Sequence, residues 1–244
     1  MNVKLTLSYD GTNYSGWQIQ PNADSVQERL ETALKQVTGQ DIKVVGSGRT
    51  DAGVHAQGQV ANFIIDKENV PAKRYKNALN TFLPPDIRVL DSSRVDDDFN
   101  ARKSAKKKTY RYSLYVSDVE LPLKERYAVR LDKMPDISLM KATAKVMTGE
   151  KDFKAFCASG SGAKTTVRTV YNVDIESKGE DIFISVTGGG FLYNMVRIMV
   201  GTLVEVGNGR LTTADVEKAF ATGERAYNGK TLPAKGLCLL KVEY

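Results

Sequence analysis

The sequence is poor in the side chains that bind soft metals or form disulfides, with two cysteines and one histidine among 244 residues. Cys157 and Cys238 lie far apart and form no C-x-x-C pair, so we expect no disulfide framework and a reducing compartment. Together with His55 they supply too few ligands for a zinc site. The H-x-E and P-C-x-x-C signatures of zinc deaminases are also absent, which excludes that class of base-modifying enzyme.

Long apolar runs are missing as well. The densest apolar segment, residues 191–206, is shorter than the roughly 20 residues of a membrane-spanning helix and contains Arg197. The N-terminal residues MNVKLTLSYD alternate like a strand and lack the apolar core of a signal peptide. We therefore expect a cytoplasmic protein with no membrane partner.

The chain carries a modest excess of positive charge, with 35 Lys and Arg against 29 Asp and Glu and a formal net charge of +6. This balance suits an anionic partner such as a nucleic acid, although a mildly basic protein without such a partner remains an alternative. The length is sufficient for a sizeable core, in one large domain or two small ones.

Apolar periodicity predicts a first series of strands and helices in residues 1–105. Ser25 and Glu28 form a capping box, which marks a helix start. Pro84 and Pro85 cannot continue a helix, so they mark an end. The predicted strands are 3–9, 44–45, 59–65 and 87–90, and the predicted helices begin at Ser25 and span 72–83.

A similar series follows in residues 106–244. The predicted strands are 107–116, 169–176, 181–186 and 237–242, and the predicted helices are 137–147, a segment from Phe191, and 213–221. Both series read strand–helix–strand–strand–helix–strand. They predict an α+β protein of two related halves, 1–105 and 106–244, each a split βαβ unit of the RRM or ferredoxin-like type. We expect mixed, mainly antiparallel sheets with helices packed on one face.

The loop at Gly46–Ala56 reads G-S-G-R-T-D-A-G-V-H-A and falls between two predicted strands. Its glycines allow positive φ and a close approach to a ligand, and such loops often carry catalytic groups. It is not a P-loop, and Asp51 occupies the third glycine position of G-x-G-x-x-G. From these residues alone two interpretations stay open: Asp51 caps a turn, or it is a catalytic carboxylate.

A basic segment crosses the boundary between the halves. Six of the ten residues from Arg102 to Arg111 are Lys or Arg, and Tyr110 and Tyr112 follow closely. Cations neutralise phosphates while aromatic rings stack on unpaired bases, so the pattern suits RNA. A solvated strand edge is the alternative. Within a strand the two tyrosines share one face and Arg111 takes the other, so only one tyrosine needs to enter a site. The candidate RNA contacts are Arg102, Lys103, Lys106, Lys107, Lys108 and Arg111.

The segment after the triple glycine is apolar nearly all round, apart from a stripe formed by Asn194, Arg197 and Gly201. An unpaired buried guanidinium costs several kcal/mol. Arg197 therefore requires a carboxylate or phosphate partner. A core ion pair and a functional pair are both consistent with this requirement.

Six strings in all, spaced along the whole chain, resemble one known family. The loop string G-R-T-D-A-G-V-H is accompanied by S-Y-D-G-T-N-Y-S-G-W-Q at 8–18, D-F-N-A-R at 98–102, K-T-Y-R-Y at 108–112, M-V-R-I-M-V-G at 195–201 and P-A-K-G-L at 233–237. In this order they resemble the TruA family of tRNA pseudouridine synthases. The resemblance implies conversion of uridine to pseudouridine at positions 38, 39 and 40 in the anticodon stem-loop of tRNA. It also implies a homodimer that needs no metal and no redox cofactor.

The same resemblance implies roles for particular residues. Asp51 is the expected catalytic nucleophile, and Arg197 is expected to orient it, with the nearby arginines holding the pKa of the carboxyl down. Tyr110 is expected to contact the flipped base, Arg49 to fill the vacated space or anchor a phosphate, and Leu237 to wall the pocket. Because these residues come from both halves, we expect the site in a cleft between them.

Two other functional classes stay open at this stage. A noncatalytic RNA-binding module predicts that Asp51 is dispensable. A carboxylate hydrolase requires a second essential acid, for which Asp10 and Asp98 are candidates. We do not assign His55 as a general base, because it accompanies the family motif without being its catalytic group, and no G-x-S-x-G string supports a serine hydrolase built on Ser47.

Overall fold

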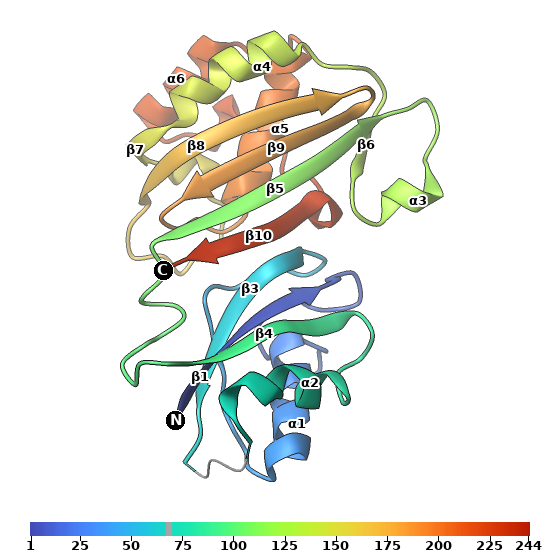
Figure 1. Cartoon of the computed structure of the whole chain (residues 1–244). Helices are drawn as coiled ribbons and strands as arrows, with labels where there is room; N and C mark the ends of the chain where they lie inside the picture. Colours follow the sequence, from blue (N-terminus) through green and yellow to red (C-terminus); the bar gives the residue numbers. More distant parts are fainter. Residues whose placement is uncertain (67–69) are drawn as a thin grey trace. The chain divides into compact units, whose positions relative to one another are not determined.

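The computed structural model describes residues 1–66 and 70–244 and divides into two compact units (Figure 1). Unit 1 comprises residues 1–106 together with 238–244, and unit 2 comprises 107–237. The sequence analysis assigns the closing strand to the second half, whereas all but its first residue lies in unit 1. The reason is a pairing that no local pattern encodes: Cys238 and Leu239 align in parallel with His55 and Ala56.

Unit 1 has the strand order of a split βαβ unit. Its elements are β1 (Asn2–Tyr9), α1 (Val26–Thr38), β2 (Val45–Gly46), β3 (His55–Ile64), the single turn η1 (Ala72–Arg74), α2 (Tyr75–Asn80) and β4 (Ile87–Val95). Antiparallel pairing gives the order β4-β1-β3, and β2 pairs with β3 near its far end. β10 (Leu237–Glu243) uses the same edge of β3 closer to its beginning. The order 4-1-3-2 is that of the ferredoxin-like unit.

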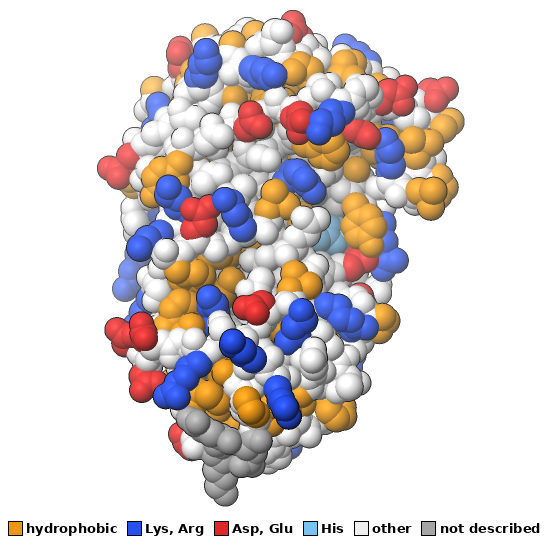
Figure 2. Space-filling model, in the orientation of Figure 1, with side chains coloured by type: hydrophobic (Ala, Val, Ile, Leu, Met, Phe, Trp, Pro, Cys, Tyr) orange, Lys and Arg blue, Asp and Glu red, His pale blue; other side chains and the backbone are white. Residues whose placement is uncertain are grey.

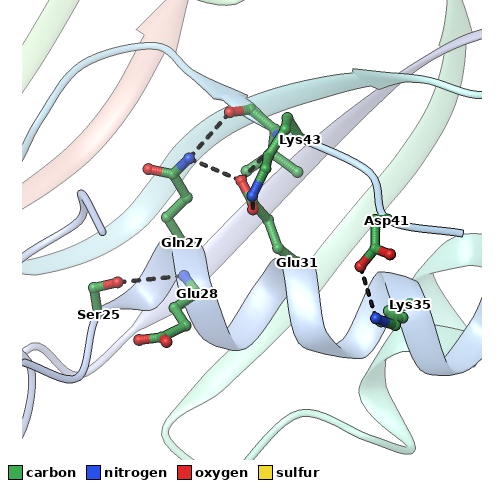
Figure 3. A network of polar contacts seen from close by, with 8 residues as sticks. Ser25, Gln27, Glu28, Glu31, Lys35, Asp41 and Lys43 are labelled. Atoms are coloured by element: carbon green, nitrogen blue, oxygen red, sulfur yellow. Dashed lines mark hydrogen bonds and ion pairs between the residues drawn. The ribbon is translucent and has the colours of Figure 1, made fainter. Parts of the chain in front are cut away.

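The first strand and helix form as their patterns predict. Every second residue of β1 is buried, which directs Val3, Leu5 and Leu7 into the core. Helix α1 begins where the Ser25 side chain accepts a hydrogen bond from the Glu28 N–H at 3.3 Å, and it ends at Gly39 in the left-handed conformation (Figure 3).

A buried carboxylate on α1 anchors the chain that leads into the Asp51 loop. Glu31 is only 8% exposed, and Figure 3 shows its side chain reaching the segment after the helix. One oxygen accepts from the Val44 N–H at 3.2 Å and from the Gln27 amide at 2.9 Å, and the other pairs with Lys43 at 2.8 Å. These bonds satisfy a charge whose burial would otherwise be costly, and they fix the segment that precedes β2.

Unit 2 repeats the split βαβ order and adds elements to it. Antiparallel pairing gives β5-β9-β8-β7, with β6 parallel to β5. The order β5-β9-β8 corresponds to 1-3-2 of the repeated unit. Both units thus confirm the predicted α+β class with mixed, mainly antiparallel sheets. The elements are β5 (Lys107–Val116), α3 (Pro122–Glu125), β6 (Val129–Leu131), α4 (Ile137–Ala144), β7 (Gly149–Asp152), β8 (Val167–Lys178), β9 (Asp181–Gly188), α5 (Met195–Gly207) and α6 (Thr213–Thr222).

Helix α5 starts later than the apolar run suggests. The prediction begins it at Phe191, but Asn194 has φ 58° and therefore cannot continue a right-handed helix. The helix begins at Met195, and ten of its thirteen residues are buried, as expected for a segment that is apolar nearly all round.

Candidate active site

Asp51 lies in a tight turn between β2 and β3. The Val54 N–H donates to the Asp51 carbonyl oxygen at 3.1 Å, and Gly53 between them has φ 77°, a conformation that favours glycine. The Asp51 side chain is half-buried, whereas Arg49, two residues earlier, is exposed. The turn therefore holds the carboxylate in a fixed backbone frame at the protein surface.

The string at residues 8–18 forms one wall of this turn. Gly16 has φ 98°, and a Cβ atom there would lie 2.4 Å from the Thr50 carbonyl oxygen. A Cβ atom on Gly11 would lie 2.0 Å from the Val54 carbonyl oxygen. Only glycine permits so close an approach of two backbones. These two glycines are thus explained by contact with Thr50, which precedes Asp51, and with Val54, which ends the turn.

Hydrogen bonds from the same string complete the wall. The Trp17 N–H donates to the Thr50 carbonyl oxygen at 3.0 Å, and the Thr50 hydroxyl lies 2.8 Å from the Tyr9 hydroxyl. The Gly53 N–H donates to the Tyr14 carbonyl oxygen at 3.3 Å. Burial raises the pKa of Tyr9, so its phenol stays neutral. Trp17 is 3% exposed and belongs to the core.

The residues before Asp51 are held from β3. The buried Ser47 hydroxyl donates to the Gln59 side-chain oxygen at 2.6 Å, and the Gln59 amide donates to the Gly48 carbonyl oxygen at 3.0 Å. A Cβ atom on Gly46 would lie 2.5 Å from the Trp17 indole. Both ends of the loop are therefore anchored, which is the condition for a preorganised catalytic group.

The side chains that a hydrolase would need have structural contacts here. The Gly11 N–H donates to His55 Nδ1 at 3.0 Å, and Asp10 Oδ1 lies 3.1 Å from the same nitrogen. The same Asp10 oxygen accepts from the backbone and hydroxyl of Thr12 at 3.0 and 2.6 Å, as a turn residue does. The Ser47 hydroxyl donates its proton to Gln59, whereas a serine–histidine pair would require it to donate to the histidine.

The string D-F-N-A-R forms a structural loop in unit 1. The Ala101 N–H donates to the Asn62 side-chain oxygen at 2.9 Å, and the Asn2 amide donates to the Phe99 carbonyl oxygen at 2.9 Å. Asp98, the other candidate for a second acid, is exposed in this loop. Sequence reasoning missed Asn2 and Asn62, which are buried by this loop although they lie on the face of their strands opposite to Val3 and Phe63.

The tyrosines of β5 share one face, as predicted, and have different surroundings. Tyr112 is fully buried, donates to the Pro233 carbonyl oxygen at 2.5 Å and packs against Gly236, where a Cβ atom would lie 2.5 Å from its ring. Burial raises its pKa. Tyr110 is 8% exposed, and its ring meets Phe191 edge-to-face at 5.4 Å. Tyr112 is therefore the core tyrosine and ties the strings at 108–112 and 233–237 together.

Arg197 is fixed by two neutral acceptors within unit 2. Its Nε donates to the Leu232 carbonyl oxygen at 2.7 Å, and its Nη1 donates to the Asn194 side chain at 2.6 Å. A Cβ atom on Gly201 would lie 2.0 Å from the Lys230 carbonyl oxygen. The stripe formed by Asn194, Arg197 and Gly201 is thus the part of α5 against which residues 229–232 pack. That packing role was not predicted.

The cations of the basic segment are divided between the two units and, within unit 2, between the two faces of β5. Arg102, Lys103 and Lys106 belong to unit 1 and are exposed, whereas the remaining three lie on β5 in unit 2. Strand alternation places Lys108 on the tyrosine face and directs the others to the opposite face. There Lys107 lies over the Tyr171 ring at 5.2 Å and Arg111 over the Phe183 ring at 5.4 Å.

The remaining candidate, Leu237, is 6% exposed at the start of β10. Among residues 1–66 and 70–244, no three His, Cys, Asp or Glu side chains cluster as a metal site would require. In the same part of the chain, no helix has the length and apolar character needed to cross a membrane.

Comparison with known proteins places this chain in a family. The family described as "tRNA pseudouridine synthase" matches residues 6–104 and 143–244. The matched residues include Asp51 and Arg197, whereas Tyr110 lies in the unmatched segment.

Individual relatives match along the full chain. The tRNA pseudouridine synthase A of Syntrophotalea carbinolica is 49% identical over 99% of this chain and 96% of its own length. That of Acetivibrio thermocellus is 45% identical over 100% of this chain and 99% of its own. A solved structure titled "Crystal Structure of a Cbf5-Nop10-Gar1 Complex" aligns over 82% of this chain with 12% identity and a TM-score of 0.35, too weak a likeness to inform the fold. On the family match and the full-length relatives, the chain belongs to the TruA family of tRNA pseudouridine synthases.

Proposed function

We propose that this protein isomerises uridine to pseudouridine in the anticodon stem-loop of tRNA, at positions 38–40, with Asp51 as nucleophile. The observation that carries the proposal is the Asp51 turn within a family member. Asp51 is half-buried, and its neighbours Thr50, Gly53 and Val54 each make hydrogen bonds or close backbone contacts with residues 9–17. A turn that only needed a cap would not require two glycines pressed against its carbonyl groups.

The reaction breaks the bond between the ribose and N1 of uracil, rotates the base and joins the ribose to C5. The proton on C5 leaves and N1 gains one, so the atoms and charges of substrate and product balance without an oxidant or a leaving group. A carboxylate can assist by attacking the ribose, by attacking the base ring or by helping a glycal to form. Each route requires ionised Asp51.

The target uridine must leave its stack to reach the carboxylate, at a cost of a few kcal/mol. In the proposal, Tyr110 stacks on or hydrogen-bonds the flipped base, since its ring is already held edge-on by Phe191 at 5.4 Å. Arg49, exposed two residues before the nucleophile, fills the vacated space or binds a phosphate, and Leu237 contributes an apolar wall.

Arg197 is proposed as the positioning residue for Asp51. Its Nε and Nη1 are aimed by Leu232 and Asn194, so the guanidinium plane has one orientation. An arginine beside a carboxylate favours the ionised form, which the chemistry needs. The cations at 102, 103, 106, 107, 108 and 111 are proposed to bind tRNA phosphates.

The test measures pseudouridine formation and affinity on unmodified tRNA for wild type, Asp51→Asn, Arg197→Met and Tyr110→Phe. Asp97→Asn, which changes an exposed carboxylate of unit 1, is the matched control. We expect Asp51→Asn to bind tRNA and make no pseudouridine, while the control stays active. Removing an oriented electrostatic contact costs about 100-fold or more in kcat, which is the loss expected for Arg197→Met.

Other outcomes separate the alternatives. If wild type binds tRNA and converts no uridine, the protein is a binding module and the proposed activity is wrong. If Asp51→Asn retains turnover, the nucleophile lies elsewhere.

We further propose that the protein acts in the cytoplasm as a homodimer, as the family resemblance implies. Light scattering after size-exclusion chromatography should give twice the mass of one chain. A monomer mass at micromolar concentration would contradict this.

A further inference from the structure

A second cationic surface lies on unit 1, apart from the basic segment that the sequence singled out. Lys73 and Arg74 on η1 and Lys76 on α2 are all exposed. No acidic residue occurs between residues 70 and 85, and none of these three cations takes part in an ion pair among the described residues. We call these three residues with Phe82 the α2 surface.

The positive charge on this face of unit 1 extends beyond these three residues. Figure 2 shows Lys and Arg side chains gathered over the visible face of unit 1, where Figure 1 draws α2 and β4, with few Asp or Glu among them. Two other exposed cations of unit 1, Lys35 and Arg29, are by contrast paired with Asp41 and Asp24. Unmatched cations on one face attract a polyanion.

An exposed aromatic ring ends the same surface. Phe82, two residues after the end of α2, is 51% exposed. Cations beside an open ring suit a nucleic acid, because the cations bind phosphates and the ring offers a face to a base.

The α2 surface is connected to the Asp51 turn through a short chain of contacts. The loop after α2 is held by Asp86, whose backbone oxygen accepts from the Asp10 N–H at 2.9 Å and whose carboxylate accepts from the Tyr14 hydroxyl at 2.6 Å. Tyr14 in turn accepts the hydrogen bond from Gly53 in the Asp51 turn.

The cations extend away from that end along β4. The Lys76 N–H donates to the Ser92 hydroxyl at 2.9 Å, five residues along the strand from Ile87. At about 3.3 Å per residue, the Lys76 end of the α2 surface therefore lies roughly 17 Å along the strand from Ile87, and a nucleic-acid chain bound to the cations can run along β4 toward the Asp86 end.

We propose that the α2 surface binds the phosphate backbone of the same tRNA whose uridine reaches Asp51. The inference rests on the proposed function for the identity of the RNA, but its readout is binding and does not depend on turnover. The partner is a polyanion with accessible bases, so an acidic protein is the alternative that the test excludes.

The test compares two triple variants with equal loss of charge. Lys73→Gln/Arg74→Gln/Lys76→Gln removes the α2 cations, and Lys133→Gln/Lys141→Gln/Lys145→Gln removes three exposed lysines of unit 2. Both are made in the Asp51→Asn background, and the affinity for an unmodified tRNA transcript is measured from low to physiological salt. A circular dichroism melt checks that both fold.

We expect the α2 triple to lower the slope of log affinity against log salt by about two to three, since each phosphate contact contributes about 0.7 to 0.9. The control triple should leave the slope nearly unchanged. With Asp51 restored, the α2 triple should raise KM for tRNA and leave kcat at saturation unchanged. Phe82→Ala should weaken binding about fivefold or more, whereas Leu123→Ala should not.

An unchanged slope in the α2 triple, or equal changes in both triples, overturns the proposal. These outcomes differ from failure of the proposed function, in which wild type binds tRNA normally and forms no pseudouridine.

Discussion

Gly16 shows how one residue outside the Asp51 turn can control its conformation. It combines φ 98° with a hypothetical Cβ contact of 2.4 Å to Thr50, so two separate restraints require glycine there. We expect Gly16→Ala to lower the free energy of unfolding by about 3 kcal/mol or more, because the strain of a left-handed alanine, about 1–2 kcal/mol, adds to a backbone clash. Urea unfolding and pseudouridine assays measure the two consequences.

Gly179 supplies the matched control for Gly16. It has φ 59° but nothing within 4 Å of its Cβ position, so Gly179→Ala pays the strain without the clash. We expect it to cost only about 1–2 kcal/mol and to leave turnover intact. Equal stability losses and equal activity in the two variants would show that the contact with Thr50 has no role.

At the scale of elements, the ends of a helix or strand match their prediction where they are determined by residues within the element itself. The strand at 107–116 matches its prediction, because Tyr110, Tyr112 and Leu114 alternate with Arg111 and Ser113. The helix predicted over 72–83 is regular only from Tyr75 to Asn80, and the Asn80 side chain bonds to both backbone groups of Val89 at 2.8 and 2.9 Å. That bond joins two elements, and a single-sequence pattern carries no signal for it.

Helix α6 provides a prediction about an element's end. Thr212 and Asp215 form a capping box in which each side chain bonds the other's backbone. We expect Thr212→Ala to destabilise the protein by about 1 kcal/mol. The bonds to Thr212 hold the pKa of Asp215 below its usual value, so this carboxylate stabilises the fold above its unfolded pKa of 3.8 and loses that contribution as pH falls through its folded pKa.

The pH dependence of α6 gives a second measurement on the same box. Wild type should be more stable than Asp215→Asn in urea at pH 6, and the difference should shrink as pH falls below 3.8. A difference that stays constant from pH 6 to pH 3 would mean that the ionised carboxylate contributes nothing to the cap.

At the scale of the whole molecule, local patterns gave the class of fold and the order of elements, and motif wording gave the family. They did not reveal which unit receives the last strand. Cys238 pairs with His55 across 183 positions of sequence, and apolar alternation is the same whichever neighbour a strand joins. The same distinction between local pattern and distant contact applies to the candidate site. Asp51 and Arg197 stood out in the sequence by residue type and spacing. The roles of Gly16, Asn62 and residues 229–232 depend on contacts between distant segments, which the sequence does not reveal.

The return of the chain to unit 1 predicts that its last residue stabilises a loop more than a hundred positions away. The Tyr244 ring lies 4.9 Å from that of Phe99, and its hydroxyl donates to the Ala101 carbonyl oxygen at 2.9 Å. We expect Tyr244→Ala to speed hydrogen exchange in residues 98–106 by about tenfold or more, since the lost contacts are together worth about 1.5 kcal/mol or more. Exchange in β8 and β9 of unit 2 should stay unchanged.

Tyr244→Phe separates the two contacts at this position. It keeps the ring against Phe99 and removes the hydrogen bonds of the hydroxyl with Ala101 and Ser47, so it should accelerate exchange in residues 98–106 less than Tyr244→Ala does. If both variants exchange like wild type there, the final residue does not hold the D-F-N-A-R loop. If exchange rises in unit 2 as well, the effect is global unfolding, because a local loss of contact would be confined to unit 1.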